Sequence, residues 1–262
     1  MPCFCIDIGN THTHFGVVPP TGSMIPSRLP TRLIDHPIDG IAPAFWREIN
    51  AHGPVTGISF CSVVPAASPL LRRVLDLQRI QLPVFQLTHT ANLGVPISYP
   101  RPAEIGQDRL ANSAGAHALF GTPAVVIDLG TAVTFDVITP SRGYEGGVIA
   151  PGIEIMRSYL HEKTAQLPLL DDTTDISRAI GQSTLEAMRI GTVIGFAGLI
   201  QALLDAIVAE LHQRGEPAPR VLCTGGAAGH IAGRVRPDPI SVPDLTLRGL
   251  AAAFRLNQPD RT

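Results

Sequence analysis

The chain contains the same short pattern twice, and this repeat limits the folds that it can adopt. One apolar run ends in Ile6-Asp7-Ile8-Gly9-Asn10-Thr11, and a second ends in Ile127-Asp128-Leu129-Gly130-Thr131-Ala132. Each copy places an aspartate and a glycine where an expected strand passes into a turn. The repeat predicts two similar halves with a site between them. We assign residues 1–120 to the first half and residues 121–262 to the second.

Expected strands and helices alternate along the chain, and this alternation is typical of an α/β protein. Apolar β-branched runs predict strands, whereas apolar residues at helical spacing predict helices. The expected strands cover residues 3–9, 15–18, 55–64, 83–87, 124–129, 133–139, 144–151 and 220–223, and the expected helices cover residues 38–50, 70–82, 105–120, 152–164, 177–214 and 245–257. Residues 19–30 and 88–104 are rich in proline and polar residues and are expected to form loops.

The composition excludes several classes of function. Of the 262 residues, 45% are apolar and 16% are charged, which is typical of a globular chain. The formal net charge of −2 gives no electrostatic reason to bind nucleic acid or an anionic membrane. Glycines and polar residues dilute the apolar run at 190–204, so we expect a buried helix there rather than a membrane span. The four cysteines form no CxxC pair and no basic leader precedes Asp7, which favours a cytoplasmic protein.

The two aspartate loops have the residues that a polyphosphate site needs. A carboxylate at the end of a buried strand is costly unless something pairs with it. Gly9 lets the backbone approach a ligand closely, and Asn10 and Thr11 add side-chain donors. Such a loop can hold phosphate oxygens, while the aspartate holds a hydrated divalent cation. A plain Asp-Gly hairpin is the alternative for one copy, and the second copy favours the nucleotide interpretation. Neither copy matches the P-loop or the dinucleotide fingerprint.

A second candidate lies at the start of the expected helix at 105–120, in Gly106-Gln107-Asp108-Arg109. Free N–H groups at a helix start stabilise anions. Asp108 is therefore a candidate base for an attacking hydroxyl, and Arg109 a candidate clamp for an anionic group of the substrate. A surface ion pair at a helix start is the alternative.

Three further features each allow two interpretations. His12 and His14 share a strand face, but no third ligand stands nearby, which does not favour a metal site. Thr184 and its neighbour Ser183 suit a helix N-cap or a binding role. The small-residue stripe on the long helix is consistent with close packing inside one subunit or with a dimer interface, and it consists of Gly191, Gly195 and Gly198.

Taken in order, these segments resemble the type III pantothenate kinase family, which also includes proteins called Bvg accessory factors. The resemblance spans nearly the whole chain and comprises the two aspartate loops, Tyr99, Gly106 to Arg109 with Asn112, Val133 to Asp136, Gly146 to Gly152, Leu160 to Pro168, Gly181 to Thr184 with Met188 and Gly191, and Thr224-Gly225-Gly226. It implies an actin-like (ASKHA) ATPase fold of two ribonuclease H-like halves, with the active site in the cleft between them. The implied reaction is phosphorylation of pantothenate by ATP, the first step toward coenzyme A, in a homodimer.

The resemblance also implies roles for individual residues. Asp108 matches the proton acceptor, and Asp128 matches the ligand of a monovalent cation, K⁺ or NH₄⁺. The implied ATP-binding residues, with Mg²⁺, are Asp7, Ile8, Gly9, Asn10, Thr11, His12, Thr13, His14 and Thr131; the implied pantothenate-binding residues are Tyr99, Gly106, Gln107, Asp108, Arg109 and the partner subunit's Thr184. Gln107 replaces an expected small residue and could crowd the substrate. A kinase for another small alcohol or acid, and a non-catalytic nucleotide-binding regulator, stay open as alternatives.

Overall fold

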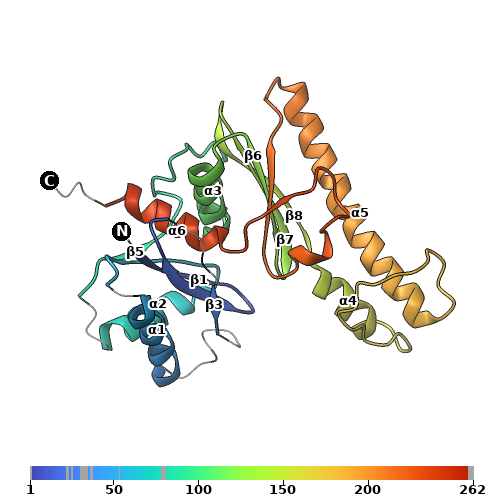
Figure 1. Cartoon of the computed structure of the whole chain (residues 1–262), viewed down its shortest axis with the longest axis horizontal. Coiled ribbons are helices and arrows are strands. Elements are labelled where there is room, and N and C mark those ends of the chain that lie inside the picture. The colour runs from blue at the N-terminus through green and yellow to red at the C-terminus, as the bar shows by residue number, and fades with distance from the viewer. Residues whose placement is uncertain are drawn as a thin grey trace. The chain divides into compact units, whose positions relative to one another are not determined.

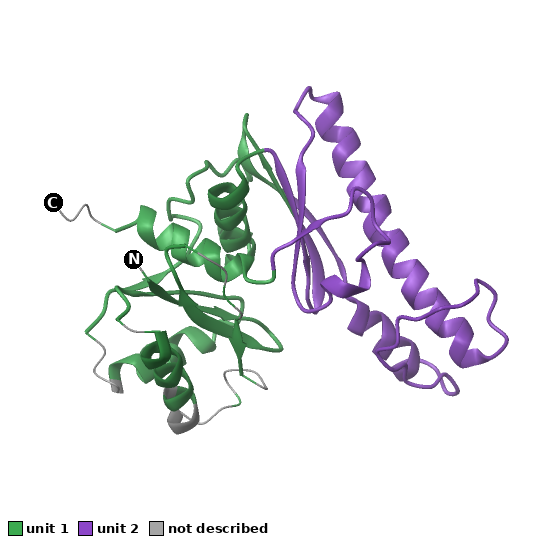
Figure 2. Ribbon diagram, viewed as in Figure 1, with its two compact units in different colours: residues 1–122, 136–146, 243–262 green, residues 123–135, 147–242 purple. Residues whose placement is uncertain are grey.

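The computed structural model describes residues 2–21, 24, 26–29, 35, 38–52, 54–77 and 81–258 (Figure 1). The chain divides into two compact units (Figure 2). Unit 1 contains residues 1–122, 136–146 and 243–262, and unit 2 contains residues 123–135 and 147–242. Unit 1 therefore includes a hairpin tip and the last helix of the chain. The assignment of residues 1–120 and 121–262 to two ribonuclease H-like halves stays a prediction.

A five-stranded sheet with the order β3-β2-β1-β4-β5 forms the centre of unit 1. Its strands are β1 (Cys3–Ile8), β2 (Thr13–Val18), β3 (Ser27–Arg28), β4 (Ile58–Ser62) and β5 (Val84–Gln86). β1 pairs antiparallel with β2 and parallel with β4. Side chains alternate along a strand, so Phe4, Ile6 and Ile8 enter the apolar core while Cys5 and Asp7 point to the opposite face.

Helices cover both faces of this sheet (Figure 1). α1 (Ile38–His52) and α2 (Ala67–Leu77) contribute Phe45 and Leu71 to the core that contains Phe4. On the other face, α6 (Leu245–Leu256) packs against β1 and against α3 (Gln107–Phe120). The short η2 helix (Pro102–Glu104) precedes α3.

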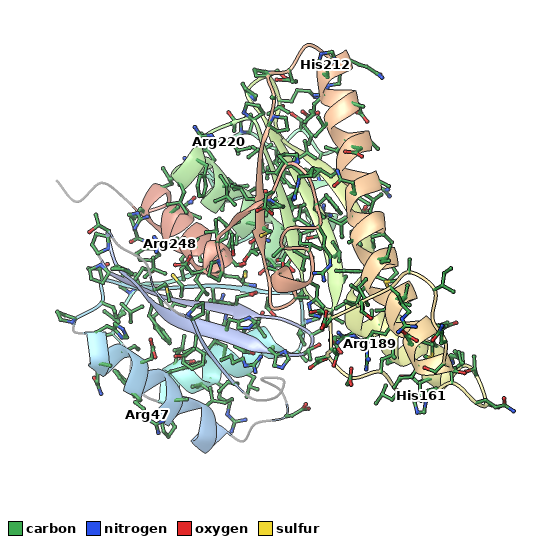
Figure 3. All side chains as sticks on the ribbon, turned by 45° about the vertical axis from the view of Figure 1, so that its right-hand side comes forward. Arg47, His161, Arg189, His212, Arg220 and Arg248 are labelled. Carbon is green, nitrogen blue, oxygen red and sulfur yellow. The ribbon has the colours of Figure 1, made fainter. Side chains whose placement is uncertain are left out.

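Polar contacts inside unit 1 fix the position of α6. Ser59 on β4 donates from its hydroxyl to the Leu250 carbonyl at 3.0 Å. Arg248, labelled in Figure 3, donates from Nε to Asp244 Oδ2 at 2.6 Å and holds the first turn of the helix. The last helix of the chain is thus anchored to the strand next to β1, which explains why unit 1 includes the C-terminal segment.

The second sheet has the order β10-β9-β6-β7-β8. Its strands are β6 (Ala124–Leu129), β7 (Ala132–Thr139), β8 (Gly143–Pro151), β9 (Arg220–Thr224) and β10 (Ile240–Ser241). β9 pairs in parallel with both β6 and β10. α4 (Ile153–Glu162), α5 (Thr184–Gln213) and the short η3 helix (Ala228–His230) complete unit 2. β6 has a neighbour on each side, which agrees with its continuous apolar run.

The α/β class is confirmed, and most predicted elements agree with the structure within a few residues. Two predictions were wrong. Residues 177–183 are not helical, because Ser183 caps the helix and its hydroxyl accepts a hydrogen bond from the Glu186 N–H at 3.2 Å. The expected loop at 19–30 contains β3, whose two residues pair with β2. β10 is equally short, and two-residue strands have too few residues to show a period.

Candidate active site

Asp7 lies at the end of β1 with a thiol beside it. The parallel register places Asp7 opposite Cys61 on β4, and Cys61 Sγ lies 3.3 Å from Asp7 Oδ1. Burial raises the pKa of the Cys61 thiol well above its ordinary value, and the charges of Asp7 and Asp108 raise it further. Cys61 therefore stays protonated and donates its S–H to Asp7. His14 Nδ1 lies 4.0 Å from the other carboxylate oxygen.

The turn after Asp7 is closed by a hydrogen bond from the Gly9 N–H to the His12 carbonyl at 2.9 Å. Asn10 and Thr11 at its tip are exposed. In the described part of the chain, the buried Thr13 hydroxyl has no hydrogen-bond partner. An exposed polar tip and an unpaired buried hydroxyl fit a loop that binds phosphate oxygens.

His12 and His14 lie beside each other, with ring centroids 6.2 Å apart. Burial lowers the pKa of His12, and the charges of Arg28 and His14 lower it further. Across the described ranges, no three His, Cys, Asp or Glu side chains cluster in a way that could hold a metal ion. The interpretation of the pair as something other than a metal site stays a prediction.

Asp108 lies in the first turn of α3, immediately after Gly106 and Gln107. Its Oδ1 accepts a hydrogen bond from the Arg109 backbone N–H at 2.8 Å. A Cβ atom at position 106 would lie 2.5 Å from that oxygen. Glycine at 106 is thus what allows the Asp108 carboxylate to fold back over the start of the helix.

The Gln107 side chain is held by hydrogen bonds to neighbouring residues. Its Oε1 accepts a hydrogen bond from the Ser62 backbone N–H at 2.9 Å and lies 3.4 Å from Gln86 Nε2. These contacts anchor the amide to the end of β4, and the expectation that this side chain crowds the substrate stays a prediction. Substrate binding by Gln107 stays a prediction, in which the backbone of this residue makes the contact.

Arg109 forms a buried network with two residues of the β7–β8 hairpin. Its Nε donates to Asp136 Oδ1 at 2.7 Å, and Tyr144 OH donates to the same oxygen at 3.1 Å. Burial lowers the pKa of Arg109, but the charges of Asp136, Tyr144 and Asp108 and the hydrogen bond to Asp136 together outweigh burial, so the net effect raises the pKa. Burial also raises the pKa of Tyr144. The Tyr99 ring lies beside this network, 6.5 Å from the ring of Tyr144.

In unit 2, Asp128 lies at the end of β6, and Thr131 is exposed in the loop that follows. Gly225 adopts a positive φ of 90°, and a Cβ there would lie 2.6 Å from the Leu129 carbonyl oxygen and 2.7 Å from Asp128 Oδ1. Glycine thus lets the turn after β9 pack directly on the Asp128 loop. Carboxylate and carbonyl oxygens of this kind are the ligands that a hard cation prefers.

Thr184 is the first residue of α5, and it lines a groove of 490 Å³ with residues of α4 and α5. The α5 helix is the one described helix that is long and apolar enough to cross a membrane, but core helices of soluble proteins pass the same test. The helix expected at 190–204 is partly buried: Phe196, Ile200 and Leu204 are fully buried, whereas 33% of the most apolar window of α5 is buried. A Cβ at Gly191, Gly195 or Gly198 would contact nothing within 4 Å.

The structure brings Asp7, Asp108, Arg109 and Tyr99 into unit 1, and it places Asp128, Thr131 and Thr184 in unit 2. Sequence reasoning assigned no role to Cys61, Asp136 or Tyr144. A buried aspartate in the β7 strand was the available signal for the last two, because a carboxylate there needs a partner.

Comparisons with known proteins agree on one family. The family profile described as Type III pantothenate kinase matches residues 3–206. A Type III pantothenate kinase from Akkermansia muciniphila is 42% identical over 260 residues, covering 98% of this chain and 100% of that protein.

Two solved structures share the fold. One is described as a Baf family transcriptional activator from Campylobacter jejuni, with a TM-score of 0.60, 21% identity, and coverage of 97% of this chain and 98% of that one. The other is a ROK family glucokinase from Streptomyces griseus, with a TM-score of 0.52, 16% identity, and coverage of 99% and 100%. At these identities the matches show the fold alone, and they confirm the predicted actin-like (ASKHA) class.

Proposed function

This chain belongs to the type III pantothenate kinase family, and we propose that it transfers the γ-phosphoryl group of ATP to the primary hydroxyl of pantothenate. The product is 4′-phosphopantothenate, and the reaction is the first step of coenzyme A biosynthesis. One structural observation carries the proposal: a hydrogen bond from the Arg109 N–H, 2.8 Å long, orients the Asp108 carboxylate at the start of α3, in the same unit as Asp7. A base and a cation-binding carboxylate in one unit suit phosphoryl transfer.

ATP is bound through its phosphates in this proposal. The binding residues are Asp7, Ile8, Gly9, Asn10, Thr11, His12, Thr13, His14 and Thr131. The support is the closed turn from Gly9 to His12, the exposed tip and the unpaired Thr13 hydroxyl. Asp7 would hold Mg²⁺ through water, and Mg²⁺ neutralises the developing charge on the phosphates when it is bound. Asp128 would hold K⁺ or NH₄⁺, which its carboxylate and the adjoining Leu129 carbonyl support.

Pantothenate is bound by Tyr99, Gly106, Gln107, Asp108 and Arg109, with the partner subunit's Thr184 completing the pocket. Arg109 is the natural partner of the pantothenate carboxylate, because guanidinium groups bind carboxylates through paired hydrogen bonds. A homodimer is supported by the exposed small-residue stripe on α5 and by the neighbouring apolar groove. A net charge of −2 supports a cytoplasmic enzyme that binds neither nucleic acid nor membrane.

Asp108 accepts the proton of the attacking hydroxyl. A primary alcohol is a far weaker acid than a carboxylic acid, so complete deprotonation before attack is unfavourable. The proton moves late, as the oxygen approaches phosphorus in a loose transition state. Most of the acceleration then comes from holding the hydroxyl in line and from neutralising phosphate charge.

The test is ATP consumption by the purified protein with Mg²⁺ and K⁺, offered pantothenate, glucose or acetate. Turnover with pantothenate alone supports the proposal, and a loss of rate when Na⁺ replaces K⁺ supports the role of Asp128. Asp108→Asn is expected to lower kcat by about 10²–10⁴-fold with little change in ATP affinity. Asp76→Asn, on the exposed face of α2, is the matched control. Turnover with glucose or acetate instead would make the chain a kinase for another acceptor. ATP binding without any turnover would favour a non-catalytic regulator.

A further inference from the structure

We infer that Asp136 and Tyr144 are positioning residues that set the direction of the Arg109 guanidinium and so select an acceptor that carries a carboxylate. This inference rests on the proposed function, because it concerns the substrate side of the same site. Neither residue received a role from the sequence. Both act through Arg109 and are not proposed to touch the reacting atoms.

The side chains of Arg109, Asp136 and Tyr144 form a largely buried network within unit 1. Asp136 is fully buried, and its Oδ1 accepts hydrogen bonds from Arg109 Nε at 2.7 Å and from Tyr144 OH at 3.1 Å. The Arg109 side chain is 12% exposed. A short charge-assisted bond in such surroundings is strongly directional, so it fixes one orientation of the guanidinium.

The position of this bond on the guanidinium decides how the group is oriented toward a ligand. The group is planar and has five N–H donors, one of which is on Nε. Asp136 binds the Nε donor, which fixes the plane of the guanidinium and the direction of its two terminal nitrogens. The terminal nitrogens of a guanidinium bind a carboxylate in a paired geometry that a lysine cannot reproduce. A fixed plane therefore favours a carboxylate in one place over a neutral group.

Tyr144 connects Arg109 to a second predicted substrate residue. Its backbone N–H donates to the Pro96 carbonyl at 2.9 Å, and its carbonyl accepts from the Ser98 N–H at 2.8 Å. These bonds hold the segment that ends in Tyr99, whose ring lies beside the Tyr144 ring. Tyr144 thus holds the Tyr99 segment through its backbone and the partner of Arg109 through its hydroxyl.

A different role for Asp136 predicts the opposite sign. If its charge alone mattered, Asp136 would repel the carboxylate of the acceptor, and its removal would improve binding of that acceptor. If it positions Arg109, its removal weakens the binding. Asp136→Asn keeps the shape and removes the charge, so the direction of the change separates the two roles. Tyr144→Phe keeps both the charge and the ring and removes one hydrogen bond, so it tests positioning alone.

The experiment measures kcat/KM for pantothenate and for pantothenol, which carries an alcohol in place of the carboxylate. The ratio of the two values is expected to fall about tenfold in Asp136→Asn and about threefold in Tyr144→Phe. The fall should come through KM for pantothenate, with KM for ATP unchanged. The exposed Arg142→Gln in the same hairpin is the control and should keep the wild-type ratio.

Each outcome bears on the inference. A ratio that rises in Asp136→Asn, or stays unchanged in both variants, overturns it. Thermal melting identifies a variant that does not fold, and Tyr144→Phe then decides the matter, because losing one hydroxyl costs little stability. If the wild-type protein phosphorylates pantothenate and both variants keep the wild-type ratio of kcat/KM values, the inference alone is refuted. Wild-type protein inactive on pantothenate refutes the proposed function and removes the basis of the inference.

Discussion

Gly106→Ala is a small change that acts on the Asp108 carboxylate. Gly106 has φ of −56° and ψ of 135°, a conformation that alanine adopts without strain. The added Cβ would lie 2.5 Å from Asp108 Oδ1, while its other neighbours lie at 3.6 Å. The oxygen is the end of a side chain and can move, so the fold is expected to tolerate the substitution.

The size of the effect follows from this distance. The oxygen must move by about 0.9 Å to reach the 3.4 Å at which ordinary contact begins. That movement breaks its hydrogen bond to the Arg109 N–H, which costs about 1–2 kcal/mol of stability. A shift of about 1 Å in a catalytic group can lower the rate about 100-fold. We therefore expect kcat to fall by about that factor, with a loss of only about 2–8 °C in Tm.

The assay compares kcat, KM for ATP and Tm in Gly106→Ala and in Gly229→Ala, where a Cβ would contact nothing within 4 Å. The control should keep the wild-type kcat, and neither variant should change KM for ATP. Wild-type kcat in folded Gly106→Ala would refute the reasoning, because the observed position of the Asp108 carboxylate would then be irrelevant to the reaction.

Three other changes test separate parts of the structure. Cys61→Val removes the S–H donor to Asp7 and should raise KM for Mg-ATP about threefold, whereas Cys61→Ser keeps a donor and should not; equal KM values in both would contradict this. Gly225→Ala forces alanine to a φ of 90° against Asp128, so it should lower stability by at least about 1–2 kcal/mol and weaken activation by K⁺, as melting and a K⁺ titration would show. Ser183→Ala removes the N-cap of α5 and should cost about 1 kcal/mol in denaturant unfolding, and an unchanged midpoint would argue against the cap.

Local patterns predicted the elements of the fold well. The apolar run before Asp128 predicted β6, and helical spacing predicted α3 and α6 within two residues of their observed bounds. These predictions succeed because strand and helix periods are set by neighbours in the sequence. The start of α5 was misplaced because Ser183 and Ser177 are equally suitable as N-caps, and only the observed bond to the Glu186 N–H distinguishes them.

The sequence did not predict the contacts between residues that lie far apart in the chain. Cys61 lies 54 positions from Asp7, and Asp136 lies 27 positions from Arg109. Each pair depends on strand register or on how a hairpin packs, and local composition does not encode either. Gln107 shows the same limit: the sequence marked it as an unusual residue, but only the fold shows that its amide is bonded to the Ser62 N–H.

Three acidic side chains of unit 1, those of Asp7, Asp108 and Asp136, accept hydrogen bonds from different kinds of donor, and the donors match the proposed roles. Asp136 is fully buried and bound by a guanidinium, the strongest of the three donors, so it cannot turn toward a ligand. Asp108 accepts a hydrogen bond from the Arg109 backbone N–H, which orients the carboxylate for its proposed role as proton acceptor. Asp7 accepts from a thiol, which is the weakest donor, so it can reorient when a hydrated cation arrives. If this order is right, replacing Cys61 affects ATP binding, moving Asp108 affects turnover, and replacing Asp136 affects the choice of acceptor.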